Sequence, residues 1–283
     1  LLQAVVPQEF SAVLVKGRGN YLSKRRLARA WDRKASLFGD DVEVKSLETI
    51  ADWARDTADG TLATLPQLER MSVWDRVQSD SSNCMGRKCP LYDKCHYQGA
   101  RRRMENGDLL IVNHALFFSD LAMRQEGASF LPPYDHVILD EAHTIEDVAS
   151  DHFGITISEF AVEHLLNSLY SERTHKGFLT SVKLKKDEAQ AGLDRALDVV
   201  AQARMAAEGF FDDLLRWQDR EGRRNGRIDE PYIIEDSLSP ALTDLVGALR
   251  LLNGKLAREP DQYELSGYLS RAQMFVAAVQ AWL

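Results

Sequence analysis

Apolar and polar residues follow different patterns in the two halves of the chain. In the first half, short apolar runs at residues 10–16, 108–114 and 136–140 predict strands. Apolar residues at helical spacing predict a helix at 47–54, with Ser46 as N-cap, and further helices are predicted at 21–34, which is basic, and at 71–77, 97–105 and 115–124. Because strands that alternate with helical crossovers are typical of parallel sheets, this half predicts part of an α/β fold. In such sheets, ligands collect at the carboxyl ends of the strands.

The second half of the chain predicts helices alone. One apolar stripe at helical spacing comprises Leu193, Leu197, Val200, Ala203, Ala207, Phe210 or Phe211, and Leu214. Two more helices are predicted at 237–258 and 262–283, separated by residues 259–261, with a charged connector at 222–231. We therefore expect an all-helical domain from residue 155 onward, whose apolar stripes pack into its core.

The overall composition is that of a soluble globular protein. The chain has 283 residues, 45% of them apolar and 28% charged, which is enough for one large or two to three small domains. No stretch approaches the roughly 18 consecutive apolar residues of a membrane span. We expect no membrane segment and a cytoplasmic location.

Two adjacent carboxylates and a histidine follow the third apolar run, in the sequence Asp140-Glu141-Ala142-His143. At the end of a buried strand, one carboxylate can hold Mg²⁺ through its water ligands, and the next can orient or deprotonate an attacking water. The alternative is a core strand followed by a helix whose first turn is favourably negative. The apolar lead-in and the histidine three residues after Asp140 favour a Walker B-type motif.

The motif that would cradle the phosphates of a nucleotide does not occur in the sequence. No Gly-x-x-x-x-Gly-Lys-Ser/Thr is present, and Gly17-Arg18-Gly19-Asn20 has neither the spacing nor the Lys-Ser/Thr pair. The chain also begins at Leu1 without an initiator Met. We therefore expect an internal piece of a larger ATPase that does not hydrolyse ATP by itself.

All three cysteines lie close together, at Cys84, Cys89 and Cys95. A tight, odd-numbered cluster indicates a metal site rather than a disulfide framework, and thiolates favour zinc or an iron–sulfur cluster. Both usually need a fourth ligand, for which the adjacent His96 and the more distant Asp93 are weak candidates. The alternative is three thiols that hold no metal.

The net charge of −8 conceals two basic runs. The first lies between residues 16 and 34, before the cysteines, and the second lies between 87 and 103, beginning among the cysteines and ending after them. Basic runs are usually solvated surfaces, but this placement also fits a surface that binds nucleic-acid phosphates. The candidate contact residues are Lys16, Arg18, Lys24, Arg25, Arg26, Arg101, Arg102 and Arg103.

Four motifs in this order resemble one known family. They are Lys16-Gly-Arg-Gly-Asn-Tyr-Leu22, the three cysteines, Val112-Asn-His-Ala-Leu116 and Asp140-Glu-Ala-His143. Together they resemble the DinG-type helicases, relatives of XPD within superfamily 2, over about residues 1 to 150. The rest of the chain matches by its position and its helical character.

The resemblance implies an ATP-dependent 5′→3′ DNA helicase that acts on single-stranded or forked DNA. The implied fold is α/β: a partial parallel-sheet motor domain with a cysteine-containing insertion and an all-helical, arch-like insertion. The implied domains are 1–20 (motor strand and turn), 21–106 (cysteine cluster), 107–154 (motor segment) and 155–283 (arch).

The resemblance also implies roles for individual residues. Asp140 would coordinate Mg²⁺, Glu141 would activate water, and His143 would couple the nucleotide site to the DNA-bound parts. In the family, four cysteines hold a 4Fe–4S cluster, and the first of them directly follows the Gly-Arg-x-Asn-Tyr-Leu sequence. Here that position is Ser23. This departure leaves open a Ser-ligated or labile cluster, zinc, or a loop that folds without metal.

Two other classes of function are weaker alternatives. A metal-stabilised nucleic-acid-binding module would use the cysteines and the basic runs without motor activity. A redox or iron sensor would use the cysteines alone, and it explains neither the Asp-Glu pair nor the basic runs.

Overall fold

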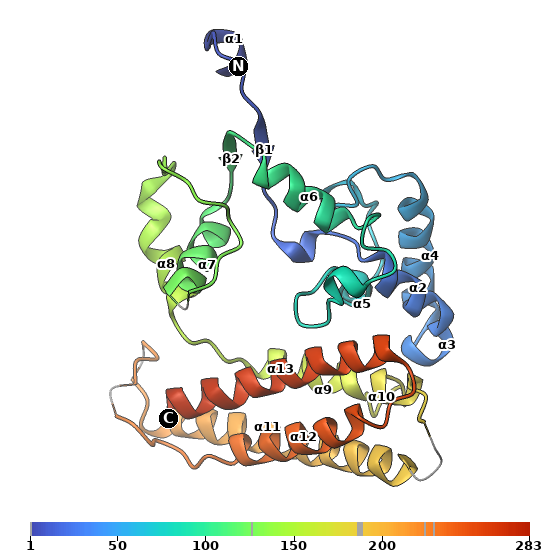
Figure 1. Ribbon diagram of the computed structural model, residues 1–283. Helices are drawn as coiled ribbons and strands as arrows, with labels where there is room; N and C mark the ends of the chain where they lie inside the picture. Colours follow the sequence, from blue (N-terminus) through green and yellow to red (C-terminus); the bar gives the residue numbers. More distant parts are fainter. Residues whose placement is uncertain (1, 126, 186–188, 224, 229) are drawn as a thin grey trace. The chain divides into compact units, whose positions relative to one another are not determined.

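The computed structural model describes residues 2–125, 127–185, 189–223, 225–228 and 230–283, and it divides into two compact units (Figure 1). The sheet unit comprises Leu1–Arg29, Ser46–Asp80 and Gly86–Ile155. The helical unit comprises Ala30–Lys45, Ser81–Met85 and Thr156–Leu283. None of the described helices is long and apolar enough to cross a membrane.

The sheet unit contains a small parallel sheet. Strand β1 (Ala12–Leu14) pairs in parallel with β2 (Leu109–Ile111), with Val13 opposite Leu110. Short helices and turns precede, connect and follow them: α1 (Leu2–Val5), η1 (Arg18–Asn20), η2 (Leu62–Thr64), η3 (Met71–Val73), α5 (Trp74–Val77), η4 (Gly86–Lys88), α6 (His96–Glu105), α7 (His114–Gln125), η5 (Ala142–Thr144) and α8 (Ile145–Phe153). The predicted parallel pairing of the first two strands is confirmed.

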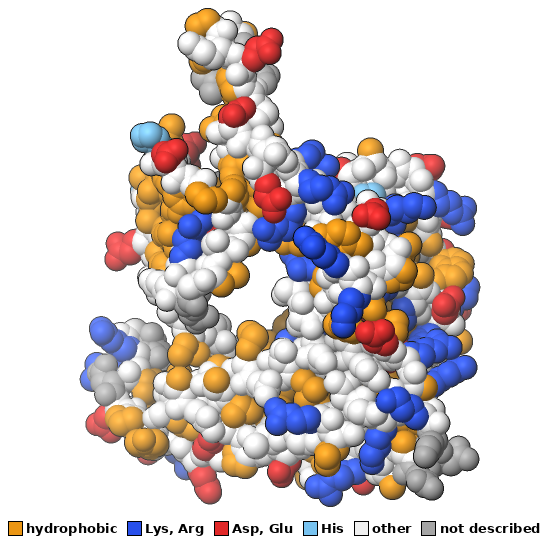
Figure 2. Space-filling model, in the orientation of Figure 1, with side chains coloured by type: hydrophobic (Ala, Val, Ile, Leu, Met, Phe, Trp, Pro, Cys, Tyr) orange, Lys and Arg blue, Asp and Glu red, His pale blue; other side chains and the backbone are white. Residues whose placement is uncertain are grey.

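The third predicted strand, residues 136–140, is wrong. These residues have no regular secondary structure, and Ile138 is 94% exposed. The apolar pattern suits a strand that is buried on both faces, but such a strand also needs a hydrogen-bonded neighbour. In the part of the chain that the structure describes, β1 and β2 pair with each other and not with this run. Figure 2 shows hydrophobic side chains gathered on the surface around α7 and α8.

The helical unit is built around four long helices that pack side by side (Figure 1). They are α9 (Glu159–Leu169), α11 (Gln190–Arg220), α12 (Leu238–Asn253) and α13 (Glu259–Trp282), with the short helices α3 (Lys34–Leu37) and α10 (Phe178–Ser181) beside them. The predicted stripe on α11 is confirmed, because its central members Val200, Ala203, Ala207 and Phe210 are buried in one continuous core.

Two short segments from the first half of the chain belong to the helical unit. Arg33 forms a buried 2.7 Å ion pair with Asp261 on α13. The Lys176 ammonium donates a hydrogen bond to the carbonyl of Phe38. A side chain at Gly267 would come within 2.7 Å of the Ser82 hydroxyl, so α13 and residues 81–85 approach closely there. This unit therefore extends beyond the helical half that the sequence pattern marks out.

Helix α4 (Asp41–Asp56) begins earlier than predicted. Its N-cap is Asp40, whose Oδ1 accepts a hydrogen bond of 2.8 Å from the Glu43 N–H. Ser46 lies buried inside the helix, and its hydroxyl accepts a hydrogen bond from the Arg70 N–H. Likewise, residues 259–261 start α13 instead of separating two helices, since proline is well tolerated in a first helical turn.

Candidate functional site

The Asp140–His143 motif forms a tight turn that leads into η5 and α8. Glu141 has a left-handed backbone (φ 48°), which is uncommon for a residue other than glycine. Its N–H donates to Asp140 Oδ1 at 3.0 Å, and its carbonyl accepts from the Thr144 N–H at 2.9 Å. The turn therefore has a defined shape, held by its own side chains.

The first residue of α7, His114, which lies three positions after β2, contacts this turn. His114 Nδ1 lies 3.2 Å from Thr144 Oγ1, and the Thr144 hydroxyl donates to the Glu141 carbonyl at 3.0 Å. Because the Thr144 hydroxyl donates its proton to the Glu141 carbonyl, its oxygen accepts a hydrogen bond from the Nδ1–H of His114. The motif thus lies beside the carboxyl end of β2, where parallel sheets bind their ligands.

The charged side chains of the turn face solvent. His143 Nδ1 lies 3.4 Å from Glu141 Oε2, and the two side chains are 76% and 71% exposed. Asp140 is exposed as well. Such carboxylates are accessible to a hydrated Mg²⁺ ion, which usually keeps several of its waters and binds through one or two carboxylates.

The residues present do not fit a four-thiolate iron–sulfur cluster. The sequence has three cysteines, which are free thiols of intermediate exposure. Ser23, at the fourth position, caps α2 (Lys24–Asp32): its Oγ accepts from the Arg26 N–H at 3.4 Å, and its own N–H donates to Val77 at 2.8 Å. Within the described ranges, no group of three or more His, Cys, Asp or Glu side chains is arranged to hold a metal ion.

The basic residues differ in their exposure and in the contacts that they make within the protein. Arg102 and Arg103 are exposed, and Arg101 pairs loosely with Glu105 at 3.4 Å. Lys24 and Arg25 are of intermediate exposure. The exposed charges of α6 are therefore the ones that solvent, or a phosphate, reaches most directly.

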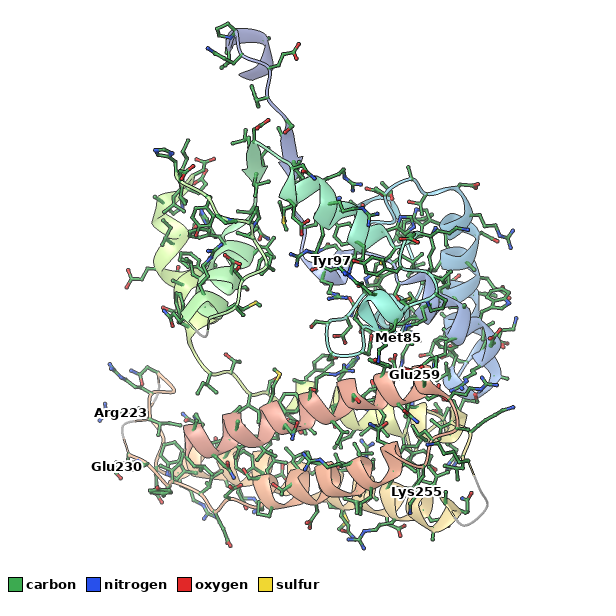
Figure 3. All side chains as sticks on the ribbon, viewed as in Figure 1. Met85, Tyr97, Arg223, Glu230, Lys255 and Glu259 are labelled. Atoms are coloured by element: carbon green, nitrogen blue, oxygen red, sulfur yellow. The ribbon has the colours of Figure 1, made fainter. Side chains whose placement is uncertain are left out.

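Three other basic residues make contacts inside the sheet unit. Arg26 is buried and donates to the Gln78 carbonyl at 2.6 Å. Lys16 donates to the Thr61 hydroxyl. Arg18 donates to Ser79, and its guanidinium lies 4.3 Å from the ring centre of Tyr97, in the first turn of α6 (Figure 3).

One polar cluster was missed by sequence reasoning. Asp120 and Arg124, four residues apart on α7, form an ion pair whose distance is 2.5 Å, and Asp120 is completely buried. Their spacing on one helix face was the available signal. Both side chains bind residues 130–132, which precede the motif.

Comparisons with known proteins point to one class of protein. No family model matches the chain. The chain is similar to proteins named ATP-dependent DNA helicase, and the resemblance to DinG-type helicases expected from its motifs is confirmed by these matches. It is 35% identical to ATP-dependent DNA helicase YoaA of Escherichia coli over 153 residues, which are 52% of this chain and 23% of that protein.

Two further relatives agree with this class. The identity is 33% over 147 residues with YoaA of Haemophilus influenzae, covering 51% of this chain and 23% of that protein. The identity is 28% over 165 residues with ATP-dependent DNA helicase DinG of Photobacterium profundum, covering 53% of this chain and 23% of that protein. The chain therefore matches about a quarter of the length of these curated relatives.

Proposed function

We propose that this chain is part of an ATP-dependent DNA helicase and contributes its Walker B-type motif. The observation that carries the proposal is the turn at Asp140–His143, which lies beside the carboxyl end of β2 and carries two exposed carboxylates. The similarity to proteins named as helicases supports it.

The two carboxylates have separate roles in this proposal. Asp140 would hold Mg²⁺, which would supply positive charge at the phosphates, and Glu141 would orient and deprotonate the water that attacks the γ-phosphate. His143, next to Glu141, couples the site to the DNA-bound parts. The glycine-rich motif that cradles the phosphates does not occur in this sequence, so we do not expect the chain alone to hydrolyse ATP.

Substitution of Glu141 tests the proposed chemistry in the full-length protein. Glu141→Gln keeps the size of the side chain but removes the base, so DNA-stimulated ATP hydrolysis should fall at least about 100-fold. Nucleotide binding, measured by titration with a fluorescent ATP analogue, should persist. Glu146→Gln, an exposed acid in the first turn of α8, is the matched control and should keep normal turnover.

Unchanged turnover in Glu141→Gln would contradict this assignment. It would favour a metal-stabilised nucleic-acid-binding module without motor activity. The exposure of residues 137–139, which fits a run that serves no motor sheet, would then be the supporting observation.

The proposed substrate is single-stranded or forked DNA, which the motor traverses in the 5′→3′ direction. Arg102 and Arg103 on α6, with Arg101, Lys24 and Arg25, would contact its phosphates without sequence preference. Arg26, Lys16 and Arg18 would support this surface through their contacts within the unit. In the same proposal, the helical unit acts as the arch that guides the single strand.

The metal content of the cysteine loop is a separate question. The proposed ligands of a metal in this loop remain Cys84, Cys89 and Cys95, and Ser23 occupies the fourth ligand position. Because a serine oxygen is a hard ligand and Ser23 caps α2, we expect no stoichiometric 4Fe–4S cluster in the native protein. Analysis of iron, zinc and sulfide in anaerobically purified protein, with its visible spectrum, tests this expectation.

Two Ser23 variants sharpen the metal analysis. Ser23→Cys supplies the fourth thiolate and should raise the iron and sulfide content if the loop can hold a cluster. Ser23→Thr keeps the helix cap and should leave the metal content unchanged. About four irons per native chain, with broad absorbance near 400 nm, would overturn the expectation.

A further inference from the structure

The carboxylate of Asp120 binds the chain ten residues further along. Oδ1 accepts hydrogen bonds from the N–H groups of Phe130, at 2.8 Å, and of Leu131, at 2.9 Å. Oδ2 accepts from Arg124 Nε at 2.5 Å. Asp120 has no exposed surface, so these bonds replace water at a fully buried charge.

Arg124 completes the attachment from the other side. It donates through Nη2 to the carbonyls of Leu131, at 3.1 Å, and Pro132, at 3.3 Å. Its guanidinium also lies 5.0 Å from the ring centre of Tyr134. Two backbone N–H groups and two carbonyls within residues 130–132 are therefore fixed to α7. We call Asp120 and Arg124 the α7 clamp.

The same helix binds the chain on the far side of the motif. His114, the first residue of α7, contacts Thr144, which holds the Glu141 carbonyl. The start of α7 is capped by Asn113, two residues after β2, whose Oδ1 accepts from the Leu116 N–H at 2.9 Å. Helix α7 thus holds both ends of the segment that contains Asp140 and Glu141.

Between these two attachments the chain has little support of its own. Residues 133–139 have no helix or strand, and all of them are exposed. The position of a segment without a hydrogen-bonded ladder depends on where its ends are held. The α7 clamp sets one end, and the contact between His114 and Thr144 sets the other.

We propose that Asp120 and Arg124 are positioning residues for ATP hydrolysis, which hold the Asp140–Glu141 pair at the carboxyl end of β2 through residues 130–132. This inference rests on the proposed function. The clamp touches neither nucleotide nor metal, so its loss affects the rate of the chemical step through the placement of Glu141 and leaves the binding of ATP intact.

Steady-state kinetics of the full-length protein test the proposal. Asp120→Asn keeps an oxygen that accepts from the two N–H groups but weakens the bond to Arg124. Asp120→Ala removes the bonds to the N–H groups as well as the bond to Arg124. We expect kcat to fall about tenfold for Asp120→Asn and further for Asp120→Ala, with the KM for ATP within twofold of the native value. Each rate is divided by the concentration of nucleotide-binding sites, which is measured by titration in each preparation. Unfolded protein therefore does not lower the kcat value.

The control and the conservative variant exclude a general loss of structure. Asp135→Asn removes the same charge from an exposed position nearer the motif and should leave kcat unchanged. Arg124→Lys retains a cation that reaches Asp120 and should lose less activity than Arg124→Ala. If Asp120→Ala does not fold, Arg124→Ala and Asp120→Asn carry the test.

Hydrogen–deuterium exchange gives a readout that does not need catalysis. Opening of the clamp should speed exchange of the Phe130 and Leu131 amides and of the hydrogen-bonded Glu141 and Thr144 amides, while β1 and β2 keep native rates. Faster exchange with native kcat would overturn the positioning role, and so would native exchange with reduced kcat. Normal turnover in Glu141→Gln would instead refute the proposed function, independently of the exchange result.

Discussion

The helical unit and the sheet unit use their apolar residues in opposite ways. The helical unit buries the stripe of α11 against its neighbours, so that Phe210 is 1% exposed. The sheet unit leaves Val137, Ile138 and Leu139 at 46%, 94% and 41% exposure. A helix satisfies its own backbone and needs a packing partner on one face, whereas a parallel strand needs neighbours at its edges and cover on both faces. The helical stripe of α11 is therefore buried, whereas the apolar run at 137–139 stays exposed.

The largest expected effect is on the free energy of unfolding, where substitution of a core residue is compared with substitution of an exposed residue. Phe210→Ala removes a ring that lies 5.4 Å from Phe211 and 6.2 Å from Trp282, centre to centre. It should lower the free energy of unfolding of the helical unit by about 3–5 kcal/mol. Ile138→Ala should change stability by less than about 0.5 kcal/mol, because the side chain is already in water. Urea denaturation followed by circular dichroism measures both, and a comparable loss in Ile138→Ala would break the comparison.

A smaller effect is expected for the buried ion pair of the helical unit. Asp261→Asn keeps the shape of the side chain but removes the charge that faces Arg33, and should cost about 1.5–3 kcal/mol. In the sheet unit, Glu105→Gln removes the partner of Arg101 in an exposed pair and should cost less than about 1 kcal/mol. Equal losses in the two variants would show that burial does not separate these pairs. The measurement is the same denaturation series.

The smallest effect is a pH dependence in the sheet unit. Burial raises the pKa of Asp59, but hydrogen bonds from Thr61 and the charge of Lys16 together lower it below its usual value near 3.8. Because the folded pKa is depressed, the stabilisation is present above about pH 4 and is lost as the pH falls through the folded pKa. Asp59→Asn should flatten the stability profile of this unit between about pH 5 and 2. Asp56→Asn, at the exposed end of α4, serves as the control and should retain the native slope.

The sequence predicted most helices because their periodicity is a local property. Helices α6, α7, α11 and α12 lie close to the ranges that the sequence predicted. The start of α4 was missed because Asp40 and Ser46 are both good N-caps, and the structure uses Ser46 inside the helix to bind the Arg70 N–H. The strand at 136–140 was wrong because a strand pattern does not show whether a neighbouring strand is present to pair with it.

The candidate site was predicted in part. The residues of the Asp140–His143 motif stand out in the sequence, and their chemical roles remain proposals. The left-handed backbone at Glu141 and the contact between His114 and Thr144 depend on tertiary structure. The α7 clamp was missed because an Asp and an Arg four residues apart usually form a solvent-exposed pair, and the burial of Asp120 is visible only in three dimensions.

The ion pair between Arg33 and Asp261 has a consequence for synthesis on the ribosome. The two residues are 228 positions apart in the sequence, so Arg33 leaves the exit tunnel long before its partner is translated. At about 5–20 residues per second, the delay is roughly 10–45 s. During that time Arg33 lacks the buried carboxylate on α13 with which it finally pairs. Its guanidinium therefore stays open to solvent and to chaperones until translation reaches that helix.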